Sequence, residues 1–473
     1  MNAARRVPAV AVILAVLVIA GLADRRGRTT SDADVGPPVP MAAAADAGSS
    51  AWYCTGATAN PDGFADGRVI VANAGDRPLQ GIVTVYPFGG APVPAPIQVP
   101  AIGRQVIRLG DVAAAPFASA LVELDGGDAV VELVDSGPFG DTSAPCASTA
   151  SSEWYFADGV TTKDATETLY LFNPFPDDAV VDLVFDTEEG QITPQALTGL
   201  TVQGGTTAVI PVGDSVQRRE QVAATVTARA GRLVVTRLQT FDGSAGRKGI
   251  ALTLGAASAG ALWYLPEGLV ADGITERYHV FNPSTTEARV QVELVLDQGQ
   301  AEPFVLTVPA EARVTIAAND EARIPKGVSH AATVRSLNGV GVVVERAVDA
   351  AVSGARTGLS QTTGAQVTAK RWAFAAGGSD DTVEEILVFQ NPGTEVARVS
   401  VTVLADGTRV TNDALQGIEV APGGRRSVRL GDSVTLAATP VLVTSDQPII
   451  VERVLNRPKS AGIGISVGIP LRD

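Results

Sequence analysis

The sequence predicts an all-β protein made of four tandem, Ig-like antiparallel β-sandwich repeats of about 100 residues each, behind an N-terminal hydrophobic helix. Three observations lead to this prediction. Four tryptophans recur at nearly equal spacings, the same short motifs follow each of them in the same order, and apolar residues between these motifs alternate with polar ones. A long repeat with a two-residue apolar period is typical of repeated strands and not of helices.

The N-terminal segment is expected to bring the chain to a membrane. Residues 1–6 are basic, and residues 7–23 form an uncharged apolar run that is just long enough to cross a bilayer as a helix. The run is either an uncleaved transmembrane anchor or the core of a cleaved signal peptide. Arginines at 25, 26 and 28 follow it directly, which favours the anchor. Residues 24–51 contain three prolines and an alanine-rich stretch and are predicted to be a flexible linker.

Each repeat opens on a tryptophan. The spacings between these tryptophans are 102, 109 and 109 residues. Asn-Pro follows 19 residues after each of the last three, and Asn73-Ala74 takes that place in the first repeat. These markers place the four sandwiches at residues 52–149, 154–257, 263–365 and 372–470. The markers themselves are Trp52, Trp154, Trp263 and Trp372, and Asn173, Asn282 and Asn391.

Strand periodicity inside the repeats defines their architecture. Val290, Val292 and Leu294 alternate with polar residues, and similar segments give about seven short strands per repeat, as in an antiparallel sandwich. A β-propeller with two blades per repeat is the alternative, but it would need a half-length repeat of about 50 residues, and we find none. Because the connectors have only a few residues, we expect a rod or arc of stacked sandwiches.

The two cysteines both belong to the first repeat. Cys54 stands two residues after Trp52, where other repeats have Phe or Leu, and Cys146 lies near the closing strand. A disulfide between them is the simplest reading, with two buried thiols as the alternative. A disulfide indicates an oxidising compartment, so the folded part is expected outside the cytoplasm.

Composition restricts the chemistry that the chain can perform. A net charge of −15 lacks the basic footprint of a nucleic-acid partner, and two histidines with two cysteines cannot form a Cys/His zinc cluster. His279 and His330 occupy no repeated polar position and are expected to be single substitutions on strand faces. We therefore assign no catalytic residue, cofactor or metal site, and predict that the protein is not an enzyme.

Two sets of charged residues recur. Carboxylates between the tryptophan and the asparagine predict a solvated acidic loop in each repeat, with calcium binding as the alternative. These carboxylates are Asp62, Asp66, Asp158, Asp164, Glu267, Asp272, Asp380 and Asp381. The segments VVEL, VVTR, VVER and IVER are centred on Glu132, Thr236, Glu345 and Glu452. Adjacent Glu and Arg on a strand point to opposite faces, so one must lie inside, and a structural ion pair is expected.

These motifs resemble those of a repeated β-sandwich domain of unknown function found in secreted and membrane-anchored proteins of bacterial cell envelopes. The resemblance rests on WYFADG at 154–159, LFNP at 171–174, VFNP at 280–283, VPA at 308–310 and VVER at 343–346, and extends over nearly all of 52–470. It implies a fold and an envelope location, and it supplies no catalytic residues.

Three functions remain open. The first is a non-catalytic envelope protein, tethered through residues 7–23 or secreted, that serves as scaffold, spacer or adhesive surface. The second is a glycan- or cell-wall-binding protein, and the third is an envelope hydrolase or an accessory to glycan synthesis. The expected partners are the membrane and a cell-wall glycan or envelope protein.

Overall fold

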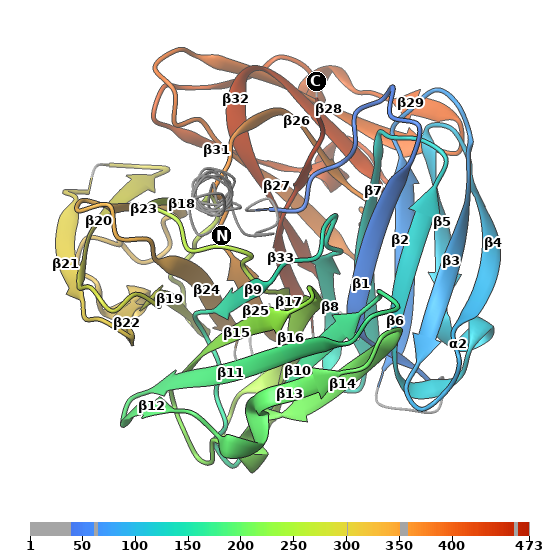
Figure 1. Ribbon diagram of the computed structural model, residues 1–473. Helices are drawn as coiled ribbons and strands as arrows, with labels where there is room; N and C mark the ends of the chain where they lie inside the picture. Colours follow the sequence, from blue (N-terminus) through green and yellow to red (C-terminus); the bar gives the residue numbers. More distant parts are fainter. Residues whose placement is uncertain (1–38, 61–64, 300, 351–357, 458–461, 473) are drawn as a thin grey trace, which may run out of the picture. The chain divides into compact units, whose positions relative to one another are not determined.

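A computed structural model describes residues 39–60, 65–299, 301–350, 358–457 and 462–472. Within these residues no helix is both long and apolar enough to cross a membrane. The predicted anchor at 7–23 lies outside the described residues. The rest of the chain is almost entirely β-structure, in four units that follow the tryptophan repeat (Figure 1).

The strands of the four units correspond to one another. Unit 1 comprises β1 (Ser50–Ala59), β2 (Asp66–Asn73), β3 (Leu79–Pro87), β4 (Val93–Val99), β5 (Gly103–Arg108), α2 (Leu109–Val112), β6 (Ala115–Leu124), β7 (Ala129–Gly137) and β8 (Gly140–Pro145). Unit 2 comprises β9 (Glu153–Phe156), β10 (Ala165–Asn173), β11 (Ala179–Thr187), β12 (Gly190–Ile192), η1 (Gln195–Leu197), β13 (Thr198–Val202), β14 (Thr206–Pro211), η2 (Val212–Asp214), β15 (Val222–Ala230), β16 (Val234–Asp242) and β17 (Lys248–Leu254).

The second half of the chain repeats this order. Unit 3 comprises β18 (Leu262–Leu265), β19 (Ile274–Asn282), β20 (Ala288–Leu296), β21 (Phe304–Val308), β22 (Ala312–Ala317), η3 (Ala318–Asp320), β23 (His330–Ser336), β24 (Val343–Ala350) and β25 (Gly358–Thr363). Unit 4 comprises β26 (Ala369–Phe374), β27 (Glu384–Gln390), β28 (Ala397–Ala405), β29 (Thr408–Val410), η4 (Asp413–Leu415), β30 (Ile418–Val420), β31 (Arg425–Arg429), η5 (Leu430–Asp432), β32 (Val441–Asn456), β33 (Ile463–Val467) and β34 (Ile469–Pro470).

Each unit is a sandwich of two antiparallel sheets, as the apolar alternation predicts. In unit 3 the sheet orders are β18-β23-β20-β21 and β22-β19-β24-β25. Val290, Val292 and Leu294 of β20 are buried, Gln291 and Glu293 between them are half-buried, and the preceding Arg289 is exposed. In unit 1 the long strand β1 pairs with both β6 and β2 and so joins the two sheets into one. The predicted fold class of sandwich repeats is confirmed.

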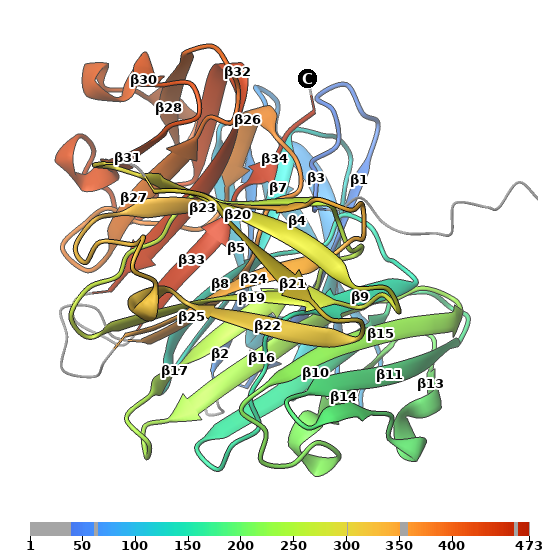
Figure 2. The same ribbon diagram turned by 90° about the vertical axis from the view of Figure 1, so that its left-hand side faces the viewer.

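The four sandwiches close into a ring instead of forming a rod or arc. The last full strand of each unit lies near the centre, where β8 contacts β17, β17 contacts β25, β25 contacts β33, and β33 returns to β8. Figure 1 shows the units in four sectors around this centre, and Figure 2 gives the side view. The expectation of a rod or arc is therefore wrong. The arrangement is that of a four-bladed propeller in which each blade is a sandwich, because each unit packs against the next around the centre.

The two ends of the described chain close the ring. Ala42 is fully buried, forms a parallel bridge with Leu471, and donates its backbone N–H to Pro470 O at 3.0 Å. Asp128 of unit 1 in turn donates its N–H to Ala43 O at 3.0 Å. The described part of the predicted linker, residues 39–51, thus packs against units 1 and 4, since its alanines are small enough to enter this joint. Residues 39–51 are therefore a packed segment and not a flexible linker.

A disulfide joins Cys54 of β1 to Cys146, which directly follows β8, as predicted. Both cysteines are buried. The bond therefore links the first strand of unit 1 to its closing segment beside the centre of the ring.

Candidate functional site

Buried ion pairs connect neighbouring units near the ring centre. In each case the arginine of one V-V-E-R-like segment meets the glutamate of the next segment around the ring. The pairs are Arg237–Glu345 at 2.8 Å, Arg346–Glu452 at 3.1 Å and Arg453–Glu132 at 2.7 Å. The expected structural ion pair is therefore present, but its two partners come from different units.

The strand geometry explains this chain of contacts. Adjacent residues on β24 point to opposite faces, so Glu345 reaches back to unit 2 while Arg346 reaches forward to unit 4. The carboxylate of Glu345 also accepts the backbone N–H of Ala157 at 3.0 Å. Arg346 donates to both carboxylate oxygens of Glu452, each at 3.1 Å, and to the carbonyl of Glu267. These extra hydrogen bonds offset the desolvation that a buried charge pair suffers.

A second set of ion pairs lies beside the first at two joints. Asp158 accepts from Arg313 at 3.1 Å across the joint between units 2 and 3, and Glu267 accepts from Arg425 at 2.9 Å across the joint between units 3 and 4. Both carboxylates are buried. The prediction of solvated acidic loops is wrong for these two residues, because each loop is covered by the next unit.

The other carboxylates of these loops behave differently. Asp164 is also buried and pairs with Arg247 at 3.2 Å within unit 2, so the prediction is wrong for it too, whereas Asp272 is exposed beside Lys326. Asp380 accepts hydrogen bonds from the backbone and hydroxyl of Thr382. Asp62 lies outside the described residues. Within the described ranges, no group of three or more His, Cys, Asp or Glu side chains is placed to hold a metal ion.

The joint between units 1 and 2 has a different chemistry. Leu133 takes the arginine position and Thr236 the glutamate position, so both partners of the ion pair are replaced together. Aromatic rings fill this joint instead. Tyr86 packs edge-on against Phe172 with 5.0 Å between ring centroids, and Phe117 lies 5.3 Å from Tyr170. The ring is therefore held by three polar joints and one aromatic joint.

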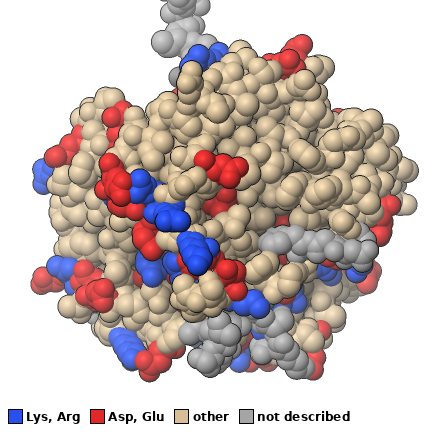
Figure 3. All heavy atoms as spheres, turned by 90° about the horizontal axis from the view of Figure 1, so that it is seen from below, with Lys and Arg blue, Asp and Glu red and all other residues tan. Residues whose placement is uncertain are grey.

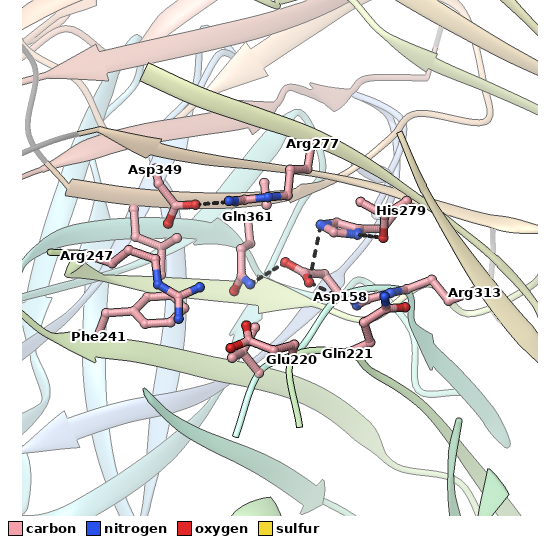
Figure 4. Close-up of a pocket in the computed structure, with 14 residues that line it drawn as sticks. Asp158, Glu220, Gln221, Phe241, Arg247, Arg277, His279, Arg313, Asp349 and Gln361 are labelled. Atoms are coloured by element: carbon pink, nitrogen blue, oxygen red, sulfur yellow. Dashed lines mark hydrogen bonds and ion pairs between the residues drawn. The ribbon is translucent and has the colours of Figure 1, made fainter. Parts of the chain in front are cut away.

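A polar cavity of about 200 Å³ opens at the joint between units 2 and 3, and we call it the 2–3 cavity (Figure 4). Asp158 lies in its wall and accepts from Gln361 Nε2 at 2.6 Å, with His279 Nε2 at 3.4 Å. On the opposite side, Arg277 and Asp349 form an ion pair at 2.5 Å. The charges of Asp158, Arg277 and Asp349 in this cavity are thus already paired.

The titratable groups of the 2–3 cavity differ in the direction of their pKa shifts. Burial raises the pKa of Asp158, but His279, Arg313 and Arg237 outweigh this effect and hold it below its ordinary value. Burial lowers the pKa of His279 to about 3, so its ring is neutral at neutral pH. Burial raises the pKa of Asp349 despite the nearby Arg277. The site can offer hydrogen bonds to a hydroxylated ligand, while the carboxylates of Asp158 and Asp349 are held by cations.

A larger cavity of about 270 Å³ occupies the corresponding place between units 4 and 1, and we call it the 4–1 cavity. Arg68, Arg104 and Arg457 line it, together with Ala376 and Gly377. Arg68 and Arg104 stand where Arg277 and Arg313 stand in the 2–3 cavity.

A repeated buried glutamate was missed by the sequence analysis. Glu167, Glu276 and Glu385 each stand six residues before the marker asparagine, and all three are buried. Glu167 and Glu385 lie against the glycine that follows the tryptophan motif, whereas in unit 3 His330 lies against that glycine. A Cβ on Gly159 would lie 2.6 Å from both oxygens of Glu167. Counting back from the asparagine would have revealed the position, but only the structure shows that it is internal.

The three glutamates have unequal surroundings. Among the described residues neither oxygen of Glu167 has a hydrogen-bond partner, and burial raises its pKa to about 8. Burial raises the pKa of Glu385 to about 7, although Arg453 and Thr439 oppose this. Glu276 instead lies 3.3 Å from His330, and Tyr278 bonds to both groups. Burial would raise the pKa of Glu276, but His330 and Arg346 lower it.

The remaining sequence markers are structural. All four tryptophans are buried in the unit cores, and Trp154, Trp263 and Trp372 donate their indole N–H to a backbone carbonyl. Each marker asparagine closes a turn by accepting from the N–H two residues on and donating to the carbonyl four residues on. The asparagines are Asn73, Asn173, Asn282 and Asn391. Asn73 makes these bonds without the proline, so the asparagine alone determines the turn.

The fold and its joints together define a closed ring of four β-sandwiches with polar cavities between the units. Residues 139–336 match a family of unknown function, DUF5719, which covers the end of unit 1, unit 2 and most of unit 3. The comparison with curated proteins gives no match.

Solved structures resemble parts of the chain. The Anabaena sensory rhodopsin transducer is 26% identical and covers 18% of this chain and 94% of its own, with a TM-score of 0.17. Thermotoga maritima 1070 is 19% identical and covers 23% of this chain and 95% of its own, with a TM-score of 0.19. A Streptomyces avermitilis alpha-L-rhamnosidase complexed with L-rhamnose is 11% identical over 70% of this chain and 44% of its own, with a TM-score of 0.16.

Proposed function

We propose that this protein is a non-catalytic scaffold of the bacterial cell envelope, tethered by residues 7–23, whose ring forms a rigid platform outside the cytoplasm. The observation that carries this proposal is the closure of the ring by buried ion pairs at three joints. Such joints fix the units relative to one another, whereas a flexible spacer would need mobile connectors. The disulfide in unit 1 supports the oxidising location.

The surface charge is consistent with a platform that binds another envelope protein. On the face in Figure 3, acidic and basic side chains lie intermixed, and wide areas between them carry no charge. The overall charge of −15 keeps such a platform soluble and disfavours a nucleic-acid partner. A membrane partner through residues 7–23 and an envelope protein bound to the ring are the partners that we propose, with secretion after signal cleavage as the alternative.

Topology in intact cells tests the proposal. The full chain is expected in the membrane fraction, with its ring accessible to added protease and with Cys54 and Cys146 alkylated only after reduction. In solution the closed ring, residues 36–473, should have a radius of gyration of about 22 Å by X-ray scattering. A cytoplasmic chain with free thiols, or a markedly larger radius, would overturn the proposal.

A second candidate function is recognition of a cell-wall glycan. The polar 2–3 cavity favours it, because Gln361 and Arg277 present hydrogen-bonding groups around a space of about 200 Å³. Saturable binding of purified cell-wall polysaccharide that is lost in Arg277→Leu would support recognition, and no binding by the folded chain would exclude it.

Hydrolysis is a third candidate. It is favoured only by the presence in one cavity of two carboxyl groups with opposite shifts, since the pKa of Asp349 is raised and that of Asp158 is lowered. A glycosidase needs such a pair facing one bond. Glycan hydrolysis that disappears in Asp349→Asn would support this reading. Release of no sugar from envelope polysaccharides by the wild-type chain would count against it.

A further inference from the structure

Arg104 of unit 1 retains a position whose acidic partner has been replaced. In unit 4 the corresponding residue, Arg425, pairs with Glu267 of unit 3 at 2.9 Å. Unit 4 has Ala376 at the place of Glu267, so no carboxylate is offered to Arg104 from that position. At the aromatic joint between units 1 and 2 the arginine is replaced as well, by Thr207. Only the joint between units 4 and 1 keeps the cation and omits the anion.

The surroundings of Arg104 do not replace the missing partner. No carboxylate of the described residues lies within ion-pair distance of its guanidinium. Asp406, Glu385 and Glu132 attract it from farther away, but burial and the charge of Arg68 outweigh them and lower the pKa of Arg104. Two guanidinium groups therefore stand near each other with a cavity in front of them.

The other charges of the 4–1 cavity are already engaged. Arg457 pairs with Asp141 at 2.8 Å. Asp380 accepts from the backbone and hydroxyl of Thr382, at 2.8 and 2.6 Å. These groups shape the cavity wall without neutralising Arg104.

Arg68 is only weakly paired. Its guanidinium donates to the hydroxyl of Ser136, and its Nε lies 3.7 Å from the carboxylate of Asp66. Burial raises the pKa of the neighbouring Asp135 to about 7, so this carboxyl is partly protonated at neutral pH. Arg68 thus keeps donors available toward the cavity.

The protein itself indicates what such an arginine binds. Asp158 and Glu267 place a carboxylate against the equivalent arginines at the other two polar joints. An external carboxylate or phosphate in the 4–1 cavity would occupy the same place relative to Arg104. Guanidinium groups suit both anions, because their donors form a planar fork.

We propose that the 4–1 cavity binds a small molecule that carries a carboxylate or phosphate group, with Arg104 and Arg68 as its anion-binding residues. A volume of about 270 Å³ lies just below the usual range of small-molecule sites and suits a ligand of roughly monosaccharide size. This site goes beyond the scaffold role and does not depend on it.

Binding to the full chain, purified in a mild detergent, tests the site by calorimetry. The probes are inorganic phosphate, glucuronate and glucose, so that a phosphate, a sugar carboxylate and a neutral sugar are compared. The key variant is Ala376→Glu, which supplies Arg104 with the internal carboxylate that Arg425 already has. We expect one or both anions to bind the wild type, and Ala376→Glu and Arg104→Leu to bind at least about tenfold more weakly, as for loss of one charge-assisted hydrogen bond.

Arg108→Leu is the matched control, because Arg108 lies on the same strand, β5, and is exposed. It should bind as the wild type does, and thermal unfolding should show that Ala376→Glu remains folded. Preference for phosphate over glucuronate, or the reverse, identifies the anion. The proposal fails if neither anion binds, if glucose binds equally well, or if folded Ala376→Glu binds with unchanged affinity.

Discussion

The joint between units 3 and 4 can be converted to the chemistry of the joint between units 1 and 2 by Arg346→Leu and Glu452→Thr. These are the residues that the chain itself places there, as Leu133 and Thr236. Each single substitution leaves its partner as a buried charge, since both side chains are fully buried. We expect each to lower the free energy of unfolding by about 3–5 kcal/mol.

The double variant removes both charges together. Without Arg346, the carbonyl of Glu267 loses one donor, and Glu276, 4.0 Å away, loses a cation, so some cost remains. The double variant should nevertheless be no less stable than the worse single variant. The coupling energy of the cycle is then about 3–5 kcal/mol.

Urea unfolding at pH 7, followed by both tryptophan fluorescence and circular dichroism, measures the cycle. Coincident transitions are needed for a single free energy of unfolding. The exposed pair Arg398–Glu419, at 3.5 Å, is the control and should give a coupling below about 1 kcal/mol when it is changed to Leu and Thr. Additive losses at Arg346 and Glu452 would refute the view that this pair holds the joint.

Three further predictions concern single groups. Replacing Cys54 and Cys146 by alanine should cost about 4 kcal/mol, because the disulfide spans 92 residues, and an unchanged urea midpoint would contradict this. The pKa of Glu167 is about 8 in the folded chain and about 4.3 when unfolded, so the folded state binds more protons between these values and loses stability as pH rises. Between pH 4 and pH 8.5 the free energy of unfolding of Glu167→Gln should therefore rise relative to that of the wild type by up to roughly 4 kcal/mol. A difference in melting temperature between variant and wild type that is the same at both pH values would contradict this prediction. Gly159→Ala should cost about 1–3 kcal/mol, since its Cβ would meet the Glu167 carboxylate at 2.6 Å, whereas Gly213→Ala, with nothing within 4 Å, should melt as the wild type does.

The sandwiches were predictable because local patterns encode them. Alternation in segments such as 288–294 gives strands and their buried face, and the marker asparagines give turns, since both depend on neighbours along the chain. The cysteine pair was predictable because both residues replace apolar contacts of one repeat. These features need no knowledge of how the units are arranged.

The ring and its cavities could not be predicted in the same way. The angle between successive units depends on packing at the joints, and no periodicity within a unit records it. From the sequence, Asp158 is predicted to be a solvated loop carboxylate. Only the fold shows that Arg313, 155 residues later in the chain, binds it. The paired exchange of Leu133 and Thr236 for Arg and Glu was visible in the sequence, but its meaning required knowing that adjacent units meet there.

Closure of the ring also sets the order in which the molecule can be completed. Glu132 is synthesised early, yet its partner Arg453 lies 321 residues farther along, whereas the other two ring pairs bridge 108 and 106 residues. Contacts so distant in sequence form slowly, because a long loop must close before they contribute. The carboxylate of Glu132 and an apolar edge of unit 1 therefore remain uncovered until unit 4 has folded against them. During folding this interval is when a chaperone, or unit 4 of a second chain exchanging into the ring, would have access to that edge.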